Sequence, residues 1–191
     1  MKKICLLILL GQMSIVSYCQ LDKKTWLVGG VGNLSTTKNT QRTNNGYQES
    51  DEFTVTISPN IGYFISDKFV VGLSQNLSWF KAEVTTFGGT KTNTIRYDLG
   101  PFLRYYFLAK EKPFNVFADV NYTVGTFKLY DIKGRRNATT FRIGTALFLN
   151  ESIALEVTGG YNSNKQNIPS RTKTSQKGVI MGIGIQIHLF K

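Results

Sequence analysis

Apolar and polar residues alternate strictly along much of this chain, and few folds accept such a pattern. Between Phe53 and Tyr63 every second residue is apolar, and the residues between them are small or polar. Successive side chains of a β-strand point to opposite faces, so this period of two predicts a strand with one apolar face. No residue in the apolar register is charged, although 18% of the chain is charged. The pattern recurs in eight segments: 26–34, 53–63, 69–79, 95–105, 114–124, 141–149, 153–161 and 179–189.

Short and long connections alternate between these segments without exception. A membrane barrel needs an even number of antiparallel strands, with both chain ends on the side of the short turns. Such a barrel closes, and it must close because lipid offers no partner to an open sheet edge. We therefore predict an all-β fold, an eight-stranded antiparallel up-and-down transmembrane β-barrel. The short connections are 66–68, 106–113 and 150–152, and the long ones are 35–52, 80–94, 125–140 and 162–178.

Alternation does not say which face points outward, and a soluble lipocalin-like barrel would alternate as well. A soluble barrel would carry many charges on its polar face, because that face would meet water. Here the polar face carries six charges that sum to zero, which fits an enclosed ion-pair network better. We predict that this network fills the lumen and blocks solutes, since eight strands leave room only for side chains. Its members are Arg96, Asp98, Arg104, Asp119, Arg142 and Glu156.

Aromatic residues of the apolar register gather near both ends of the strands. Trp and Tyr settle at the two interfaces of a membrane, so two aromatic belts around an aliphatic band favour the outward-facing interpretation. Pro59 and Pro101 lie inside predicted strands and predict a local bulge or bend at each. The belt residues are Phe53, Trp79, Tyr97, Tyr122, Phe141 and Tyr161 near the long connections, and Trp26, Tyr63, Phe69, Tyr105 and Phe114 near the short ones.

Residues 1–19 have the pattern of a secretory signal peptide. Lys2 and Lys3 precede an apolar run, and small residues precede a cleavage point between Cys19 and Gln20. We therefore expect an exported domain of residues 20–191 that contains no cysteine and that, without the two lysines, has a formal net charge of +9 in place of +11. The alternative is a lipoprotein signal in which Cys19 is retained and acylated. No later run of apolar residues is long enough for a transmembrane helix.

With these features, residues 24–191 resemble the small outer-membrane barrels of the OmpA/OmpX type. The last segment adds Gly184, Ile187 and Leu189, which match the Gly-x-x-apolar-x-apolar insertion signal that the barrel assembly machinery reads in that family. The chain departs from the family pattern because it ends in Phe190-Lys191 rather than in an aromatic residue. The resemblance implies the outer membrane of a Gram-negative bacterium, with both chain ends in the periplasm.

Some small outer-membrane barrels modify lipid A, so a catalytic role is an alternative. The enzymes known from the resemblance place a His and a Ser near the outer leaflet. The single histidine here, His188, belongs to the last segment, and the predicted topology puts it at the rim of the lumen on the periplasmic side. We therefore expect no catalytic residues. With one His and no mature Cys, we also expect no metal site and no cofactor.

Basic residues dominate the long connections, which the topology assigns to the cell surface. Lipopolysaccharide phosphates lie just outside the outer leaflet, and Lys and Arg bind phosphate through charge-assisted hydrogen bonds. We expect a non-catalytic barrel that supports envelope integrity or surface interaction through these loops, and no nucleic-acid partner, because the chain is exported. A soluble lipocalin-like periplasmic carrier is the other alternative. The basic candidates are Lys133, Arg135, Arg136, Lys165, Arg171, Lys173 and Lys177.

Overall fold

The computed structural model describes residues 21–43, 46–84, 90–129, 132–167 and 174–189, and over these ranges the chain forms eight strands. The predicted signal peptide, residues 1–19, lies outside the described residues. The strands are β1 (Trp26–Thr43), β2 (Gly46–Ser66), β3 (Phe69–Val84), β4 (Thr90–Tyr106), β5 (Phe114–Leu129), β6 (Ile132–Phe148), β7 (Ile153–Asn167) and β8 (Thr174–Leu189).

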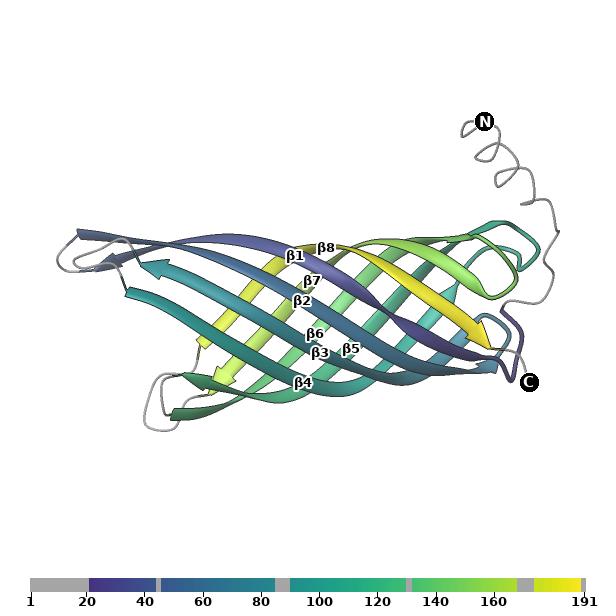
Figure 1. The fold of residues 1–191 in the computed structure, drawn as a ribbon, viewed down its shortest axis with the longest axis horizontal. Helices are drawn as coiled ribbons and strands as arrows, with labels where there is room; N and C mark the ends of the chain where they lie inside the picture. The colour runs from purple at the N-terminus through teal and green to yellow at the C-terminus, as the bar shows by residue number, and fades with distance from the viewer. Residues whose placement is uncertain (1–20, 44–45, 85–89, 130–131, 168–173, 190–191) are drawn as a thin grey trace, which may run out of the picture.

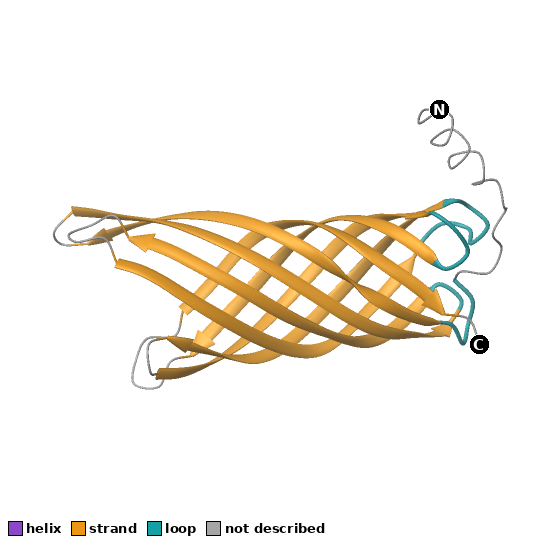
Figure 2. Cartoon of the chain, in the orientation of Figure 1, coloured by secondary structure: helices purple, strands orange, loops and turns teal. Residues whose placement is uncertain are grey.

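Each strand pairs antiparallel with the next, and β8 pairs with β1 to close the barrel (Figure 1). This confirms the predicted fold class. The short turns gather at one end of the barrel, where the described chain also starts and finishes (Figure 2). We call this the short-turn end, and the opposite end the long-hairpin end.

The apolar register faces outward. Leu99, Val120 and Ile185 expose 44%, 40% and 55% of their surface, whereas Arg104 and Asp119 are buried in the lumen. A lipocalin-like soluble barrel requires the opposite orientation, with its apolar face inside. Exposed aromatic residues of both predicted belts also lie on the outer surface, for example Trp79 and Phe114. An outer surface of this kind suits hydrocarbon bounded by two polar interfaces.

The long connections differ from the prediction, because most of their residues extend the strands. β1 continues to Thr43 and β2 begins at Gly46, so strand occupies most of the predicted loop 35–52. The sequence signal fails there for a physical reason. Once a hairpin projects beyond the apolar band, water can meet both faces, and no alternation is needed to keep the strand.

Two seams of the barrel open toward the long-hairpin end. Pairing between β1 and β8 runs from Trp26 opposite Leu189 to Leu34 opposite Met181, and β4 pairs with β5 only as far as Arg96 opposite Phe127. The described parts of these strands beyond those points are not paired across the seams. The β1–β4 hairpins and the β5–β8 hairpins therefore diverge as two separate sheets (Figure 1).

A bulge, one of the two features expected at each proline, is absent from the described pairing. Pro59 pairs with Gly30 and Pro101 with Leu73, and the register of β2 and β4 is the same on both sides of each proline. The register shift recorded for β2 lies between Phe64 and Ser66, beside the turn to β3. Each proline instead lies where pairing with one neighbouring strand pauses, which accommodates its missing N–H without an inserted residue.

Candidate functional site

Four charged side chains form a continuous ion-pair cluster across the middle of the lumen. The Arg104 guanidinium donates to Glu156 over 2.6 Å and to Asp119 over 3.1 Å. Arg142 donates from Nε to the other oxygen of Asp119 over 2.8 Å. The side chains of Arg104, Asp119 and Glu156 have no exposed surface. We call these four residues the lumenal quartet.

Strand register explains how the quartet assembles. Arg104, Asp119 and Arg142 lie directly opposite one another on β4, β5 and β6, so three neighbouring strands present one row of charge to the lumen. Gly160 on β7 faces Arg142, and a Cβ atom there would come within 2.8 Å of the Arg142 side chain. The glycine therefore leaves the space that the long arginine occupies. Glu156, four residues before Gly160 on the same face of β7, completes the cluster.

Below the quartet, apolar and aromatic side chains fill the lumen at the short-turn end. The Arg104 guanidinium lies 4.1 Å from the centre of the Phe117 ring and donates to the Tyr106 hydroxyl over 3.2 Å. Leu21, which precedes β1, is fully buried in the same cluster. We call this cluster the aromatic floor; its members are Leu21, Leu27, Phe64, Val70, Phe102, Tyr106, Phe117, Ala146, Phe148 and Ala154.

His188 lies inside this floor and not at the rim that the sequence predicted. It is fully buried, and its ring centre lies 5.4 Å from that of Phe148 and 5.8 Å from that of Phe64. Its inward direction follows from parity, because even-numbered residues of β8 face inward. The imidazole packs against aromatic rings at the end of the barrel opposite the long hairpins.

A second ion pair lies nearer the long-hairpin end, so the described ion pairs of five of the six predicted charges fall into two groups. Arg136 donates to Asp98 over 3.0 Å, and both side chains are largely buried. Gly125 of β5 lies between them in the register, opposite Asp98 on one side and Arg136 on the other. Arg96 lies two residues from Asp98 on the same face of β4. Among the described ion pairs, none links this group to the quartet.

Arg136 was predicted in a basic loop, and that assignment is wrong. It lies in β6, and its side chain points into the lumen. A signal was available in the sequence. Counting back in steps of two from Arg142, which was correctly placed on the inner face, reaches Arg136.

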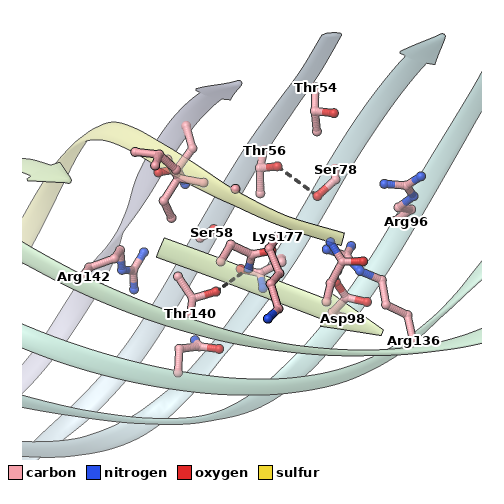
Figure 3. A pocket seen from close by; sticks show the side chains of 18 of the residues that line it. Thr54, Thr56, Ser58, Ser78, Arg96, Asp98, Arg136, Thr140, Arg142 and Lys177 are labelled. Carbon is pink, nitrogen blue, oxygen red and sulfur yellow. Dashed lines mark hydrogen bonds and ion pairs between the residues drawn. The ribbon is translucent and has the colours of Figure 1, made fainter. Parts of the chain in front are cut away.

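A polar cavity of about 330 Å³ occupies the lumen between the quartet and the long hairpins. In Figure 3, Arg96, Asp98 and Arg136 lie together on one side of it, and Thr56 and Ser78 are joined by a hydrogen bond of 3.0 Å on another. Eight strands predict a lumen filled by side chains, and this space departs from that prediction. Its polar lining is Asn33, Thr54, Thr56, Ser58, Asn76, Ser78, Arg96, Asp98, Asn121, Arg136, Thr140, Arg142, Asn162, Asn164, Ser175 and Lys177.

The other basic candidates divide between the outer face and the cavity mouth. Arg135 and Lys165 are exposed and, by register, are diagonal neighbours on the outer face of β6 and β7. Lys177 is exposed on β8 beside the open seam and lines the cavity. The structure places Lys133 in β6 without describing its side chain, and Arg171 and Lys173 lie outside the described residues.

The residues of the predicted insertion signal lie on both faces of β8. Ile187 and Leu189 are on the outer surface, with 38% and 49% of their area exposed, and Gly184 faces inward. A Cβ atom at Gly184 would approach the backbone oxygen of Gly30 to 2.7 Å, so a small residue is required where β8 meets β1.

Metal-ligating residues and imidazole bases are sparse among the described residues. Nowhere in them do three His, Cys, Asp or Glu residues gather as a metal would require. The described lining of the cavity contains neither His nor Cys, so a hydroxyl there has no imidazole beside it to act as a base. None of the described segments is a helix of the length and apolarity needed to cross a membrane.

Comparison with solved structures identifies the architecture. The chain aligns over 93% of its length with all of the outer membrane protein OprG from Pseudomonas aeruginosa, with a TM-score of 0.61 and 14% sequence identity. The fold is that of a small outer-membrane β-barrel. The outer membrane protein AlkL is also similar, with a TM-score of 0.50 and 16% identity over 89% of this chain and 92% of AlkL. No protein-family model and no curated protein sequence matches this small outer-membrane barrel.

Proposed function

We propose that the chain is a non-catalytic integral protein of a Gram-negative outer membrane that supports the envelope by binding lipopolysaccharide phosphates at its long-hairpin end. In this orientation the short turns and both chain ends face the periplasm. The signal peptide of residues 1–19 would deliver the chain for export, and the barrel assembly machinery would recognise Gly184, Ile187 and Leu189 during insertion.

Side chains that fill the lumen below the cavity are the observation that favours a binding role over a transport role. The quartet spans the lumen with side chains that have no exposed surface, and the aromatic floor fills the space beneath it. A solute would have to displace buried, paired charges, which is costly because each remaining partner would be left uncompensated. This burial supports a barrel that binds at its surfaces and does not conduct solutes.

The outer basic residues supply the phosphate contacts in this proposal. Arg135 lies six residues beyond the belt residue Phe141 on β6, and Lys165 lies four residues beyond Tyr161 on β7. Both therefore project from the outer face beyond the aromatic belt, at the level where lipid phosphates would lie. A diagonal pair of cations on adjacent strands can contact one phosphate together.

The proposal is tested by replacing both outer cations. We expect R135S/K165S to insert and migrate on heating like the parent chain but to bind fluorescent lipopolysaccharide several-fold more weakly at low salt, since exposed pairs are screened as salt rises. The matched control is K23S/K112S, which removes two exposed positive charges at the short-turn end. Equal weakening in both variants, or no weakening in the first, would contradict the assigned surface.

Modification of lipid A is the competing function. The only histidine, His188, is buried in the floor at the periplasmic end of this orientation, far from outer-leaflet substrate. We therefore expect identical lipid A mass spectra from cells with and without the protein. A new lipid A species in cells that carry it would replace the binding proposal with an enzymatic one.

A further inference from the structure

We infer that the polar cavity above the quartet is a binding site for a small hydroxylated anion, namely a sugar that carries a phosphate or a carboxylate. The inference concerns the inside of the barrel, whereas the lipopolysaccharide contacts proposed above lie on its outer face. It uses the proposed orientation only to say that the ligand arrives from outside the cell.

The charge around the cavity favours an anion. Three guanidinium groups line it, those of Arg96, Arg136 and Arg142, but only one carboxylate does, that of Asp98. Asp119 lies below and pairs with Arg142 from the quartet side. Guanidinium groups therefore outnumber carboxylates in the lining, and the low-dielectric barrel walls strengthen their field.

The Asp98–Arg136 ion pair leaves hydrogen-bonding groups on both side chains unused. Its contact joins one guanidinium nitrogen to one carboxylate oxygen, and it leaves buried Nε of Arg136 and Oδ1 of Asp98 without hydrogen-bond partners. A guanidinium has five N–H donors in a planar fork that suits phosphate and carboxylate oxygens. Arg136 can thus hold Asp98 and still donate to a ligand in the cavity.

The neutral part of the lining fits a hydroxylated molecule. It is built from Asn, Ser and Thr side chains, which can donate to and accept from sugar hydroxyls. The amide oxygens of Asn33 and Asn121 are buried there without hydrogen-bond partners. An apolar ligand would leave these acceptors unsatisfied, which costs free energy, whereas a hydroxyl donor would satisfy them.

Size and access agree with a ligand of one sugar unit. A volume of about 330 Å³ lies near the lower end of the roughly 300–1,000 Å³ range of small-molecule sites. The cavity lies where the β1–β8 seam opens, because Gly178–Ile180 of β8, which pairs with β7 but not with β1, forms part of its lining. The quartet closes it below, so a ligand that enters is retained at the cavity and not passed onward.

The test measures binding of glucose 6-phosphate to the folded barrel in zwitterionic micelles by calorimetry, with glucose and inorganic phosphate as comparators. We expect R136Q to weaken binding about tenfold or more, as loss of a charge-assisted contact implies. D98N should strengthen binding, because it removes the carboxylate that repels the ligand and competes for Arg136. The matched control is R135Q, which removes the adjacent charge from the outer face and should leave binding unchanged.

The opposite signs of two variants separate a site from a structural effect. R136Q and D98N each break the same ion pair, so simple loosening of the barrel would change binding in one direction for both. Equal losses in both variants would overturn the inference, as would an equal loss in R135Q or no binding to a correctly folded parent barrel. A strong preference for glucose over its phosphate would also overturn it.

A final arm distinguishes the source of the anion. Monophosphoryl lipid A carries a phosphorylated sugar on a lipid anchor, whereas glucose 6-phosphate is free. Binding of the lipid that is lost in R136Q would support the cavity with a lipid-borne ligand. Binding that is lost in R135Q but kept in R136Q would belong to the outer face and would count against the cavity. Because R135S/K165S leaves the cavity residues in place, failure of the surface proposal and failure of this inference give different results.

Discussion

At the scale of single residues, the quartet combines burial with nearly complete pairing. Arg104 bridges Asp119 and Glu156, and Glu156 has in addition a weak contact of 3.4 Å from the Gln186 amide. Removing one partner of a buried ion pair leaves an uncompensated charge, whereas removing both leaves only a change in packing. The arrangement therefore predicts strong coupling between the two ends of the Arg104–Glu156 bond.

A double-mutant cycle measures that coupling. We expect R104M to lower the free energy of unfolding by about 3–5 kcal/mol, since it leaves Glu156 without its cation. R104M/E156M should be less destabilised than R104M alone, because no unpaired carboxylate remains at that bond. Urea unfolding in lipid vesicles gives the values. Additive losses in the double variant would show that the bond contributes little.

Two adjacent glycines on β7 give a second test at this scale. A Cβ atom at Gly160 would lie 2.3 Å from the Phe141 backbone oxygen and 2.8 Å from Arg142, while at Gly159 nothing lies within 4 Å. We expect G160A to destabilise the barrel by about 1–3 kcal/mol through overpacking. G159A should change stability by at most about 0.5 kcal/mol, as for most surface substitutions. Similar effects of the two in urea titrations would contradict the assigned faces of β7.

At the scale of strands, the open seams predict uneven protection of backbone amides. β1 pairs with both neighbours from Trp26 to Leu34, but beyond Leu34 it pairs only with β2. Amides that point toward the missing partner lack a hydrogen bond and should exchange with solvent quickly. Hydrogen exchange followed by NMR in micelles should show fast exchange of alternate amides in 35–43. The segment 53–57 of β2, paired on both sides, is the internal control.

Uniform slow exchange along all of β1 would mean that the β1–β8 seam closes fully. Uniform fast exchange beyond Leu34, in place of alternation, would mean that the β1–β2 hairpin itself opens. Either result would also change the expected access to the cavity, since the unpaired edge of β8 lines its mouth.

The strands also show how far the sequence could predict the structure. Within the apolar band, lipid outside and packed charges inside force strict alternation, so the quartet could be placed on the inner face from parity alone. Beyond the band, both strand faces can be polar, so the extension of β1 to Thr43 left no signal. Arg136 lies in the same polar region, where only the parity counted back from Arg142 indicates its inward direction. The split of the described ion pairs into two groups depends on strand register and stagger, which one sequence does not specify.

At the scale of the whole molecule, the outer surface predicts that the cost of a charge depends on its depth. Val157 of β7 lies within the aliphatic band, between the ends of its strand, and exposes 55% of its surface. Val179 of β8, 75% exposed, pairs with the belt residue Tyr161 and therefore lies near one interface. Both valines are outward and make few contacts that an arginine would disturb, so they differ chiefly in depth.

We expect V157R to lower the free energy of unfolding by about 2–4 kcal/mol and V179R by about 0–1 kcal/mol, the depth dependence of Arg on a lipid-facing barrel surface. Refolding into vesicles and urea titration provide both values. The same substitutions on a barrel surrounded by water would cost similar, small amounts at both positions, because Arg on an exposed surface meets solvent in either place. Equal small effects would therefore contradict a membrane-embedded outer surface, and with it the orientation on which the surface proposal depends.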